Sequence, residues 1–133
     1  MKKLSIVSLR DSALAETPNS IIVKNNCIPV FADIDRETWC ITEESIEQNI
    51  SQKTKAIIVV DLYGNMPYMD SLIKISEKYS IPIIEDAAEA LGSKYKNIRA
   101  GKFGIAGVHS FHRTKTMTTG EGGALLIDNE ELF

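Results

Sequence analysis

Short runs of β-branched and other apolar residues alternate along this chain with amphipathic stretches of helical period. The apolar runs lack regular polar positions, which is typical of strands buried on both faces of a parallel sheet. Strand, helix, strand in this order implies right-handed βαβ units. We therefore predict an α/β fold with a mostly parallel sheet flanked by helices, whose clearest strands cover residues 28–33, 55–61, 81–86, 108–111 and 124–127.

Two helices are predicted between these strands. Thr42-Glu-Glu-Ser45 has the residue types of a helix N-terminus, and Ile46 and Ile50 follow at i, i+4 spacing. Residues 69–79 have the apolar periodicity of an amphipathic crossover helix. The apolar side of that helix is expected to carry Met69, Leu72, Ile73 and Ile75 or Ser76.

The two ends of the chain are less clear. The first 20 residues are compatible with a strand and then a helix over about residues 12–25, which Pro18 would interrupt. Residues 129–133 resemble the first turn of a helix with acidic residues at its start. Since a mature domain rarely stops there, we expect a fragment of a longer protein.

Composition excludes several classes of protein. The chain has 133 residues, enough for one domain, and 44% of them are hydrophobic, which argues against a disordered chain. A net charge of −3 gives no basic surface for nucleic acid, and no apolar run approaches the length of a membrane helix. The N-terminal segment lacks the apolar stretch of a signal peptide, and Cys27 and Cys40 are too few for a disulfide framework or zinc cluster. A cytoplasmic protein with reduced thiols is expected.

Acidic residues stand at the ends of three predicted strands, where ligands of open α/β sheets bind. They are Asp33, Asp61 and the pair Glu85-Asp86. Each could instead cap a turn or helix, and for Asp33 we favour that interpretation. Asp86 follows apolar residues and precedes Ala-Ala, so its carboxylate should be partly buried and should need a partner.

A second set of candidates follows the predicted strand at residues 108–111. Ser110 ends that strand, and Lys115 lies in the next loop, before a glycine-rich segment that permits positive φ and close backbone approach. A desolvated lysine near a cationic group can lose its proton and become a nucleophile, although a lone lysine is usually a solvated surface side chain. His109 and His112 are expected to pack or to support neighbouring site residues rather than to bind a metal, because no carboxylate or cysteine stands at metal-ligand spacing.

Five motifs in order resemble the sugar aminotransferases of the DegT/DnrJ/EryC1/StrS family, which are fold-type-I pyridoxal-phosphate enzymes. The resemblance covers residues 28–132, about three quarters of the chain, and its wording is closest to perosamine-synthase-like members. The matching pieces are Pro29-Val-Phe-Ala-Asp-Ile-Asp35, Thr54-Lys-Ala-Ile57 with Leu62-Tyr-Gly64, Ile84-Glu-Asp-Ala-Ala-Glu-Ala-Leu-Gly92, Ser110-Phe-His112 with Lys115, and Thr119-Gly-Glu-Gly-Gly123.

The resemblance implies a role for four residues. Lys115 matches the lysine that forms an imine with the cofactor aldehyde and then moves the substrate proton. Asp86 matches the carboxylate that keeps the pyridine nitrogen protonated. Glu89 matches a Gln or Glu position close to the ring hydroxyl, and Ser110 matches a hydroxyl that holds the phosphate. A family branch with His in place of the lysine performs deoxygenation, so Lys115 favours transamination.

The resemblance also implies a context. Residues 1–133 would be part of the aspartate-aminotransferase-like large domain, without the upstream helix that grips the phosphate and without the C-terminal domain. Leu14 aligns where most members carry an aromatic residue that stacks on the cofactor. The implied partners are a nucleotide-linked keto sugar and an amino acid donor such as glutamate. Complete relatives are homodimers that make amino sugars or surface polysaccharides, and no metal is implied.

Two alternatives remain open on sequence alone. A receiver-like or metal-binding signalling module also places carboxylates at strand ends and a lysine further along, as Asp61, Glu85-Asp86 and Lys115 could. Its acidic pair should come on the first strand, which counts against it. A non-functional remnant of a truncated gene would keep the motifs without binding the cofactor.

Overall fold

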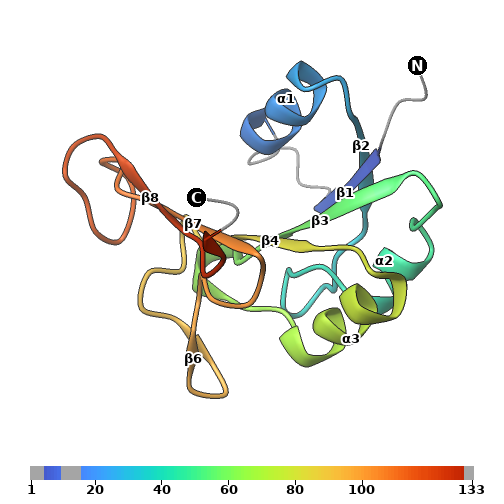
Figure 1. The fold of residues 1–133 in the computed structure, drawn as a ribbon. Coiled ribbons are helices and arrows are strands. Elements are labelled where there is room, and N and C mark those ends of the chain that lie inside the picture. Colours follow the sequence, from blue (N-terminus) through green and yellow to red (C-terminus); the bar gives the residue numbers. More distant parts are fainter. Residues whose placement is uncertain (1–4, 10–15, 131–133) are drawn as a thin grey trace.

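The computed structural model describes residues 5–9 and 16–130, which form a six-stranded sheet with helices on both faces (Figure 1). The strand order is β2-β1-β3-β4-β7-β8, and a separate two-stranded sheet pairs β5 with β6. The strands are β1 (Ser5–Leu9), β2 (Ile28–Ala32), β3 (Thr54–Val60), β4 (Ile83–Asp86), β5 (Lys94–Tyr95), β6 (Ile98–Arg99), β7 (Ala106–Ser110) and β8 (Gly123–Leu126).

The pairing confirms the predicted mostly parallel sheet. Neighbouring strands from β2 to β7 run parallel, and all five strands predicted most clearly are present. The strand suggested in the first 20 residues is β1, which lies between β2 and β3. Within the described six-stranded sheet, only β8 runs antiparallel, against β7. Its direction was not predicted, because a glycine-rich segment is compatible with either a crossover or a returning hairpin.

The helices follow local sequence signals. Helix α3 (Met69–Tyr79) has the predicted bounds and buries Met69, Leu72 and Ile75. Helix α2 (Glu43–Glu47) begins at a capping box in which Thr42 and Ser45 satisfy each other's backbone N–H groups. Helix α1 (Glu16–Lys24) contains the proline that was expected to interrupt it. That expectation was wrong, because the third residue of a helix has no intrahelical partner for its N–H.

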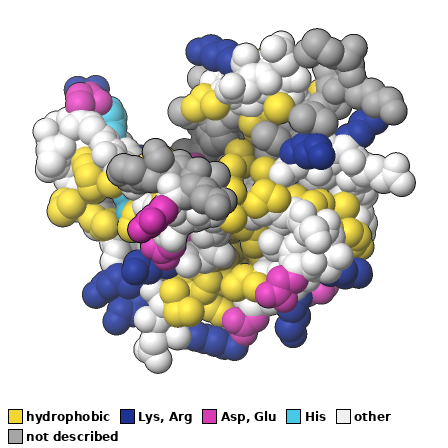
Figure 2. Space-filling model, in the orientation of Figure 1, with side chains coloured by type: hydrophobic (Ala, Val, Ile, Leu, Met, Phe, Trp, Pro, Cys, Tyr) yellow, Lys and Arg dark blue, Asp and Glu magenta, His cyan; other side chains and the backbone are white. Residues whose placement is uncertain are grey.

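One face of the sheet carries the main core. Ile57 and Val59 of β3 and Ile83 of β4 are buried with apolar residues of α2 and α3. Figure 1 shows α2 and α3 on this side of the sheet and α1 on the other. The alternate residues Ile58 and Ile84 are only half-buried, and Figure 2 shows hydrophobic side chains reaching the surface beside α1.

A few predictions fall on residues that the structure does not describe. One of them concerns Leu14, which lies outside the described ranges together with the first residues of the helix expected at 12–25. The helix expected at 129–133 also extends beyond the described residues, because residues 131–133 are not described. Both cysteines are free thiols, as expected. Among the described helices, none is long and apolar enough to cross a lipid bilayer.

Candidate functional site

The predicted site residues stand at the carboxyl ends of two adjacent parallel strands. Asp86 is the last residue of β4 and pairs in register with Val108 of β7. Ser110 is the last residue of β7, and Lys115 lies in the loop that follows. Glu89 lies in the turn after β4. The topology therefore brings all four to the edge where ligands of open α/β sheets bind.

Lys115 and Glu89 form a direct ion pair. The Lys115 Nζ atom lies 2.8 Å from Glu89 Oε1, and each side chain is only 19% exposed. The other carboxylate oxygen of Glu89 accepts a hydrogen bond from the backbone N–H of Tyr63 at 3.1 Å. Tyr63 belongs to the 3₁₀ helix η1 (Leu62–Gly64), which follows β3, and has a φ of 52°. Glu89 thus connects segments that follow β3, β4 and β7.

This pairing differs from the setting that the sequence suggested for the lysine. A neighbouring cationic group is one way in which a lysine loses its proton, whereas the ion-pair partner of Lys115 is the carboxylate of Glu89. The partner is 26 positions away in the chain, so residue spacing gave no sign of the contact. The proton on Lys115 therefore has an acceptor within hydrogen-bond distance.

Asp86 is a half-buried carboxylate with few partners. Its Oδ1 accepts a hydrogen bond from the Ala88 backbone N–H at 3.1 Å, which is the kind of capping contact that was considered as the alternative role. Burial raises the pKa of Asp86 above its ordinary value, while the Ala88 hydrogen bond and the charge of Lys115 lower it. No ion pair among the described residues involves Asp86. Such a carboxylate has capacity for a cationic ligand group.

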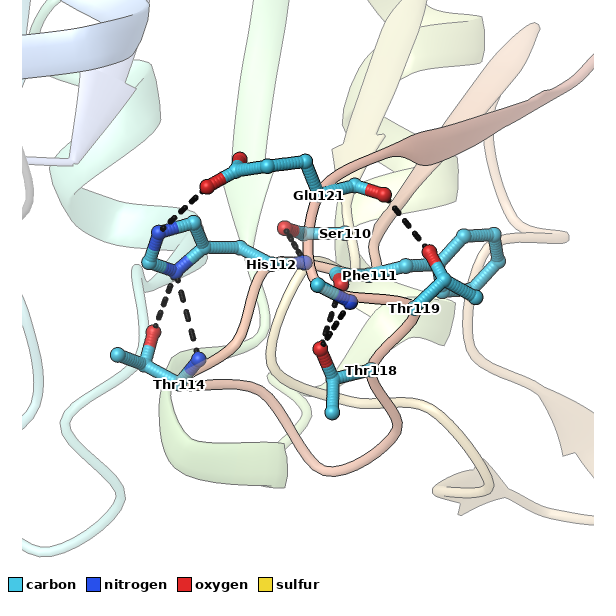
Figure 3. Close-up of polar contacts among 8 residues, drawn as sticks. Ser110, Phe111, His112, Thr114, Thr118, Thr119 and Glu121 are labelled. Atoms are coloured by element: carbon cyan, nitrogen blue, oxygen red, sulfur yellow. Dashed lines mark hydrogen bonds and ion pairs between the residues drawn. The ribbon is translucent and has the colours of Figure 1, made fainter.

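Hydrogen bonds within the loop after β7 organise the segment beyond Ser110. The Ser110 hydroxyl accepts from the His112 backbone N–H at 3.3 Å. Thr118 bridges the two sides of the loop, because its hydroxyl donates to the Phe111 carbonyl at 3.0 Å and accepts from the Gly120 N–H at 2.9 Å (Figure 3). Gly120 has a φ of 89°, which confirms the positive φ expected for this segment.

The two histidines do not gather metal ligands. His109 is buried, and its Nδ1 lies 3.2 Å from the Ala87 carbonyl, as expected of a packing residue. His112 Nδ1 accepts from the Thr114 N–H, and its Nε2 lies 3.7 Å from the exposed carboxylate of Glu121 (Figure 3). Within residues 5–9 and 16–130, no group of three His, Cys, Asp or Glu side chains is arranged to hold a metal ion.

The other acidic residues at strand ends differ in their burial and hydrogen bonds. Asp33 is exposed, and its side chain accepts a hydrogen bond from the neighbouring Ile34 N–H, in keeping with a local turn role. Asp61 does not cap η1, so a capping role for it was wrong. Asp61 and Glu85 are instead completely buried behind the site. Their apolar neighbours in sequence were the available signal, because alternation in β4 puts Glu85 on the core face.

Comparison with known proteins finds matches to a single family of aminotransferases. The model of the DegT/DnrJ/EryC1/StrS aminotransferase family matches residues 15–133. GDP-perosamine synthase from Escherichia coli O157:H7 is 44% identical over 105 residues, which are 79% of this chain and 29% of that protein. The crystal structure of an aminotransferase from Psychrobacter cryohalolentis has a TM-score of 0.88 and 37% identity, and the match covers 98% of this chain and 32% of that one.

A third relative has a cofactor in its structure. The E. coli GDP-4-keto-6-deoxy-D-mannose-3-dehydratase, described with bound hydrated PLP, has a TM-score of 0.86 and 31% identity, covering 99% of this chain and 33% of that one. The chain spans less than a third of the length of the curated relatives that it matches.

Proposed function

The chain belongs to the DegT/DnrJ/EryC1/StrS aminotransferase family, and from this premise we propose that it is part of the cofactor-binding large domain of a pyridoxal-phosphate-dependent sugar aminotransferase. The proposed reaction transfers an amino group from an amino acid, glutamate, to a keto sugar on a nucleotide carrier. GDP-perosamine synthase and the dehydratase with bound PLP support this choice of substrate and cofactor. The product would serve amino-sugar or surface polysaccharide synthesis, in a homodimer in the cytoplasm.

One observation carries the proposal: a lysine and a half-buried carboxylate lie at the same sheet edge and interact electrostatically. The charge of Lys115 lowers the pKa of Asp86, so the two side chains lie within electrostatic reach. A receiver-like module would need its lysine beside a cluster of strand-end acids. Here the ion-pair partner of Lys115 is Glu89, in a turn, and the family match removes that alternative.

The residues present fit pyridoxal phosphate. When bound, the cofactor supplies an aldehyde for covalent attachment and a ring that takes up electrons from the substrate carbon. Asp86 would hold the protonated ring nitrogen, because its half-buried carboxylate lacks a cationic partner at ion-pair distance among the described residues. Ser110 would donate its hydroxyl to the phosphate, and Glu89 would lie near the ring hydroxyl.

Glu89 and Lys115 would also manage protons. An amine reacts with a carbonyl only through a free lone pair, and the 2.8 Å contact lets Glu89 Oε1 take the proton from Lys115 Nζ. The same Nζ atom would then carry the proton removed from the substrate α-carbon. A lysine at this position, rather than the histidine of the deoxygenating branch, favours transamination over dehydration.

The test is covalent attachment of the cofactor to Lys115. The purified chain is mixed with pyridoxal phosphate, and we expect a visible absorbance band that borohydride converts into a stable adduct. The band should vanish in Lys115→Ala and persist in Lys102→Ala, a matched change of an exposed lysine. A band that persists in Lys115→Ala would overturn the proposal. The absence of a band in the unaltered chain would also overturn it.

A second substitution separates attachment from turnover. Asp86→Ala should keep the Lys115-dependent band, because the lysine is intact. In a full-length or complemented form it should abolish amino transfer, because the ring nitrogen loses the carboxylate that keeps it protonated. Amino transfer that survives Asp86→Ala would remove Asp86 from the mechanism.

A further inference from the structure

Behind the proposed site lies a pair of carboxyl groups with no access to water. Asp61 and Glu85 both have side chains with 0% exposure. Asp61 directly follows β3, and Glu85 immediately precedes Asp86 in β4. The backbone N–H of Asp61 donates to the carbonyl of Asp86 at 3.0 Å, so the two strand ends are tied together at this point.

The surroundings offer these carboxyls almost no donors. Glu85 Oε2 accepts from the Phe103 backbone N–H at 2.8 Å. Glu85 Oε1 and both carboxylate oxygens of Asp61 have no donor when both groups are ionised. No ion pair among the described residues involves either group. Two adjacent buried carboxylates without a cation are a costly arrangement.

A single proton resolves this cost. Both carboxyls are buried at the neighbouring ends of the paired strands β3 and β4, and their side chains interact, so one protonated carboxyl can donate to the other. Glu85 Oε2 already accepts an N–H, whereas neither carboxylate oxygen of Asp61 has a donor, so we place the shared proton on Asp61. We propose that Asp61 is held as a neutral carboxylic acid that donates to the Glu85 carboxylate, and that this pair positions the end of β4 that carries Asp86.

The charged and titratable groups around Asp61 agree with this assignment. Burial and the negative charges of Glu85 and Asp86 raise the pKa of Asp61 to about 9. The thiol of Cys40, from the segment before α2, lies within electrostatic reach of Asp61, and burial raises its pKa to about 11, so it stays neutral. Asp61 therefore adds no charge near Asp86, whose carboxylate remains the one available to a cationic ligand. That last link rests on the proposed function, whereas the proton-sharing pair does not.

The direct test is a carbon-13 carboxyl NMR titration of the chain without cofactor. The Asp61 resonance is identified by its loss in Asp61→Asn. We expect it to remain in the protonated form through neutral pH and to titrate near pH 9. In Glu85→Gln the midpoint should fall by about two pH units or more, because a like charge is replaced by an amide donor. If the chemical shift of Asp61 shows that it is already ionised at neutral pH, the proposal is wrong. That result would be expected if a water molecule bridged two ionised carboxylates.

Positioning is tested by amide hydrogen exchange at Phe103 and Asp61 in the same samples. Asp61→Asn keeps an N–H donor toward Glu85, so exchange at both amides should stay within about twofold of the unaltered chain. Asp61→Ala leaves the Glu85 carboxylate without that donor, and exchange should accelerate by about tenfold or more. If Asp61→Ala does not fold, Glu85→Gln is measured instead. Its amide donates to Asp61, so the exchange rates of both amides should stay within about twofold of those in the unaltered chain. Equal exchange in the Asn and Ala variants, or tenfold faster exchange in the Asn or Gln variant, would show that the pair does not hold this strand end.

Discussion

At the scale of single residues, the sequence identifies chemical types but not their partners. Lys115 and Asp86 could be proposed from their motifs, and the structure places both at the sheet edge. The ion pair of Lys115 with Glu89 joins positions 26 apart, and the Tyr63 N–H on Glu89 is a backbone group that no residue type announces. Contacts of this kind depend on how three loops meet, which local sequence does not encode.

The first residue-level prediction concerns the proton acceptor of Lys115. Glu89→Ala removes the carboxylate that lies 2.8 Å from Lys115 Nζ. The rate of covalent cofactor attachment should fall by roughly a hundredfold, the usual contribution of a positioned general base. Stopped-flow absorbance measures this rate, and Glu77→Ala, at an exposed position of α3, serves as the control. An unchanged rate in Glu89→Ala would exclude proton transfer to Glu89.

The second concerns the pH dependence of stability. The pKa of Asp61 is raised from 3.8 to about 9 in the folded chain. Between these values the folded chain binds a proton that the unfolded chain has released. The resulting stabilisation is complete below pH 3.8 and is lost as the pH rises toward 9, at roughly 1.4 kcal/mol per pH unit.

Asp61→Asn carries no such proton. The unaltered chain loses stability as the pH rises, and Asp61→Asn lacks this loss. The free energy of unfolding of Asp61→Asn minus that of the unaltered chain should therefore increase steadily between about pH 5 and about pH 8. Urea unfolding at several pH values gives this difference. A difference that stays constant across the range would mean that Asp61 does not keep its proton on folding.

At the scale of elements, local signals were sufficient for most of the fold. Helix α3 has the predicted bounds, because its apolar period and its end at Ser80, which has a φ of 53°, are local features. The strand β1 and the position of α1 were only approximate in sequence, because the first 20 residues show no clear strand or helix period and include Pro18. The reversed direction of β8 depends on pairing with β7, which is a tertiary contact.

The capping box of α2 gives a prediction at this scale. Thr42→Ala removes the side chain that accepts from the Ser45 N–H at 3.2 Å. We expect the free energy of unfolding to fall by about 1 kcal/mol, as for other N-cap substitutions. Thr42→Ser keeps the hydroxyl and should cost much less. Urea denaturation distinguishes the two, and equal losses would show that the hydroxyl is not the stabilising group.

At the scale of the whole molecule, the proposed site is a product of the assembled sheet. Asp86 comes from β4, Lys115 from the loop after β7, and the Tyr63 N–H from the segment after β3. No single segment contains all three groups. The family could be identified from ordered motifs, but the buried pair of Asp61 and Glu85 became visible only when β3 and β4 were placed side by side.

The central claim is that this assembled edge directs the cofactor to one lysine. The most direct measurement is peptide mass spectrometry after the folded chain has been treated with pyridoxal phosphate and borohydride. We expect the modification on Lys115 alone in the folded chain, and on many lysines in urea, where the loops no longer meet. Modification of the folded chain at another lysine in preference to Lys115, or the same pattern in both states, would contradict the account.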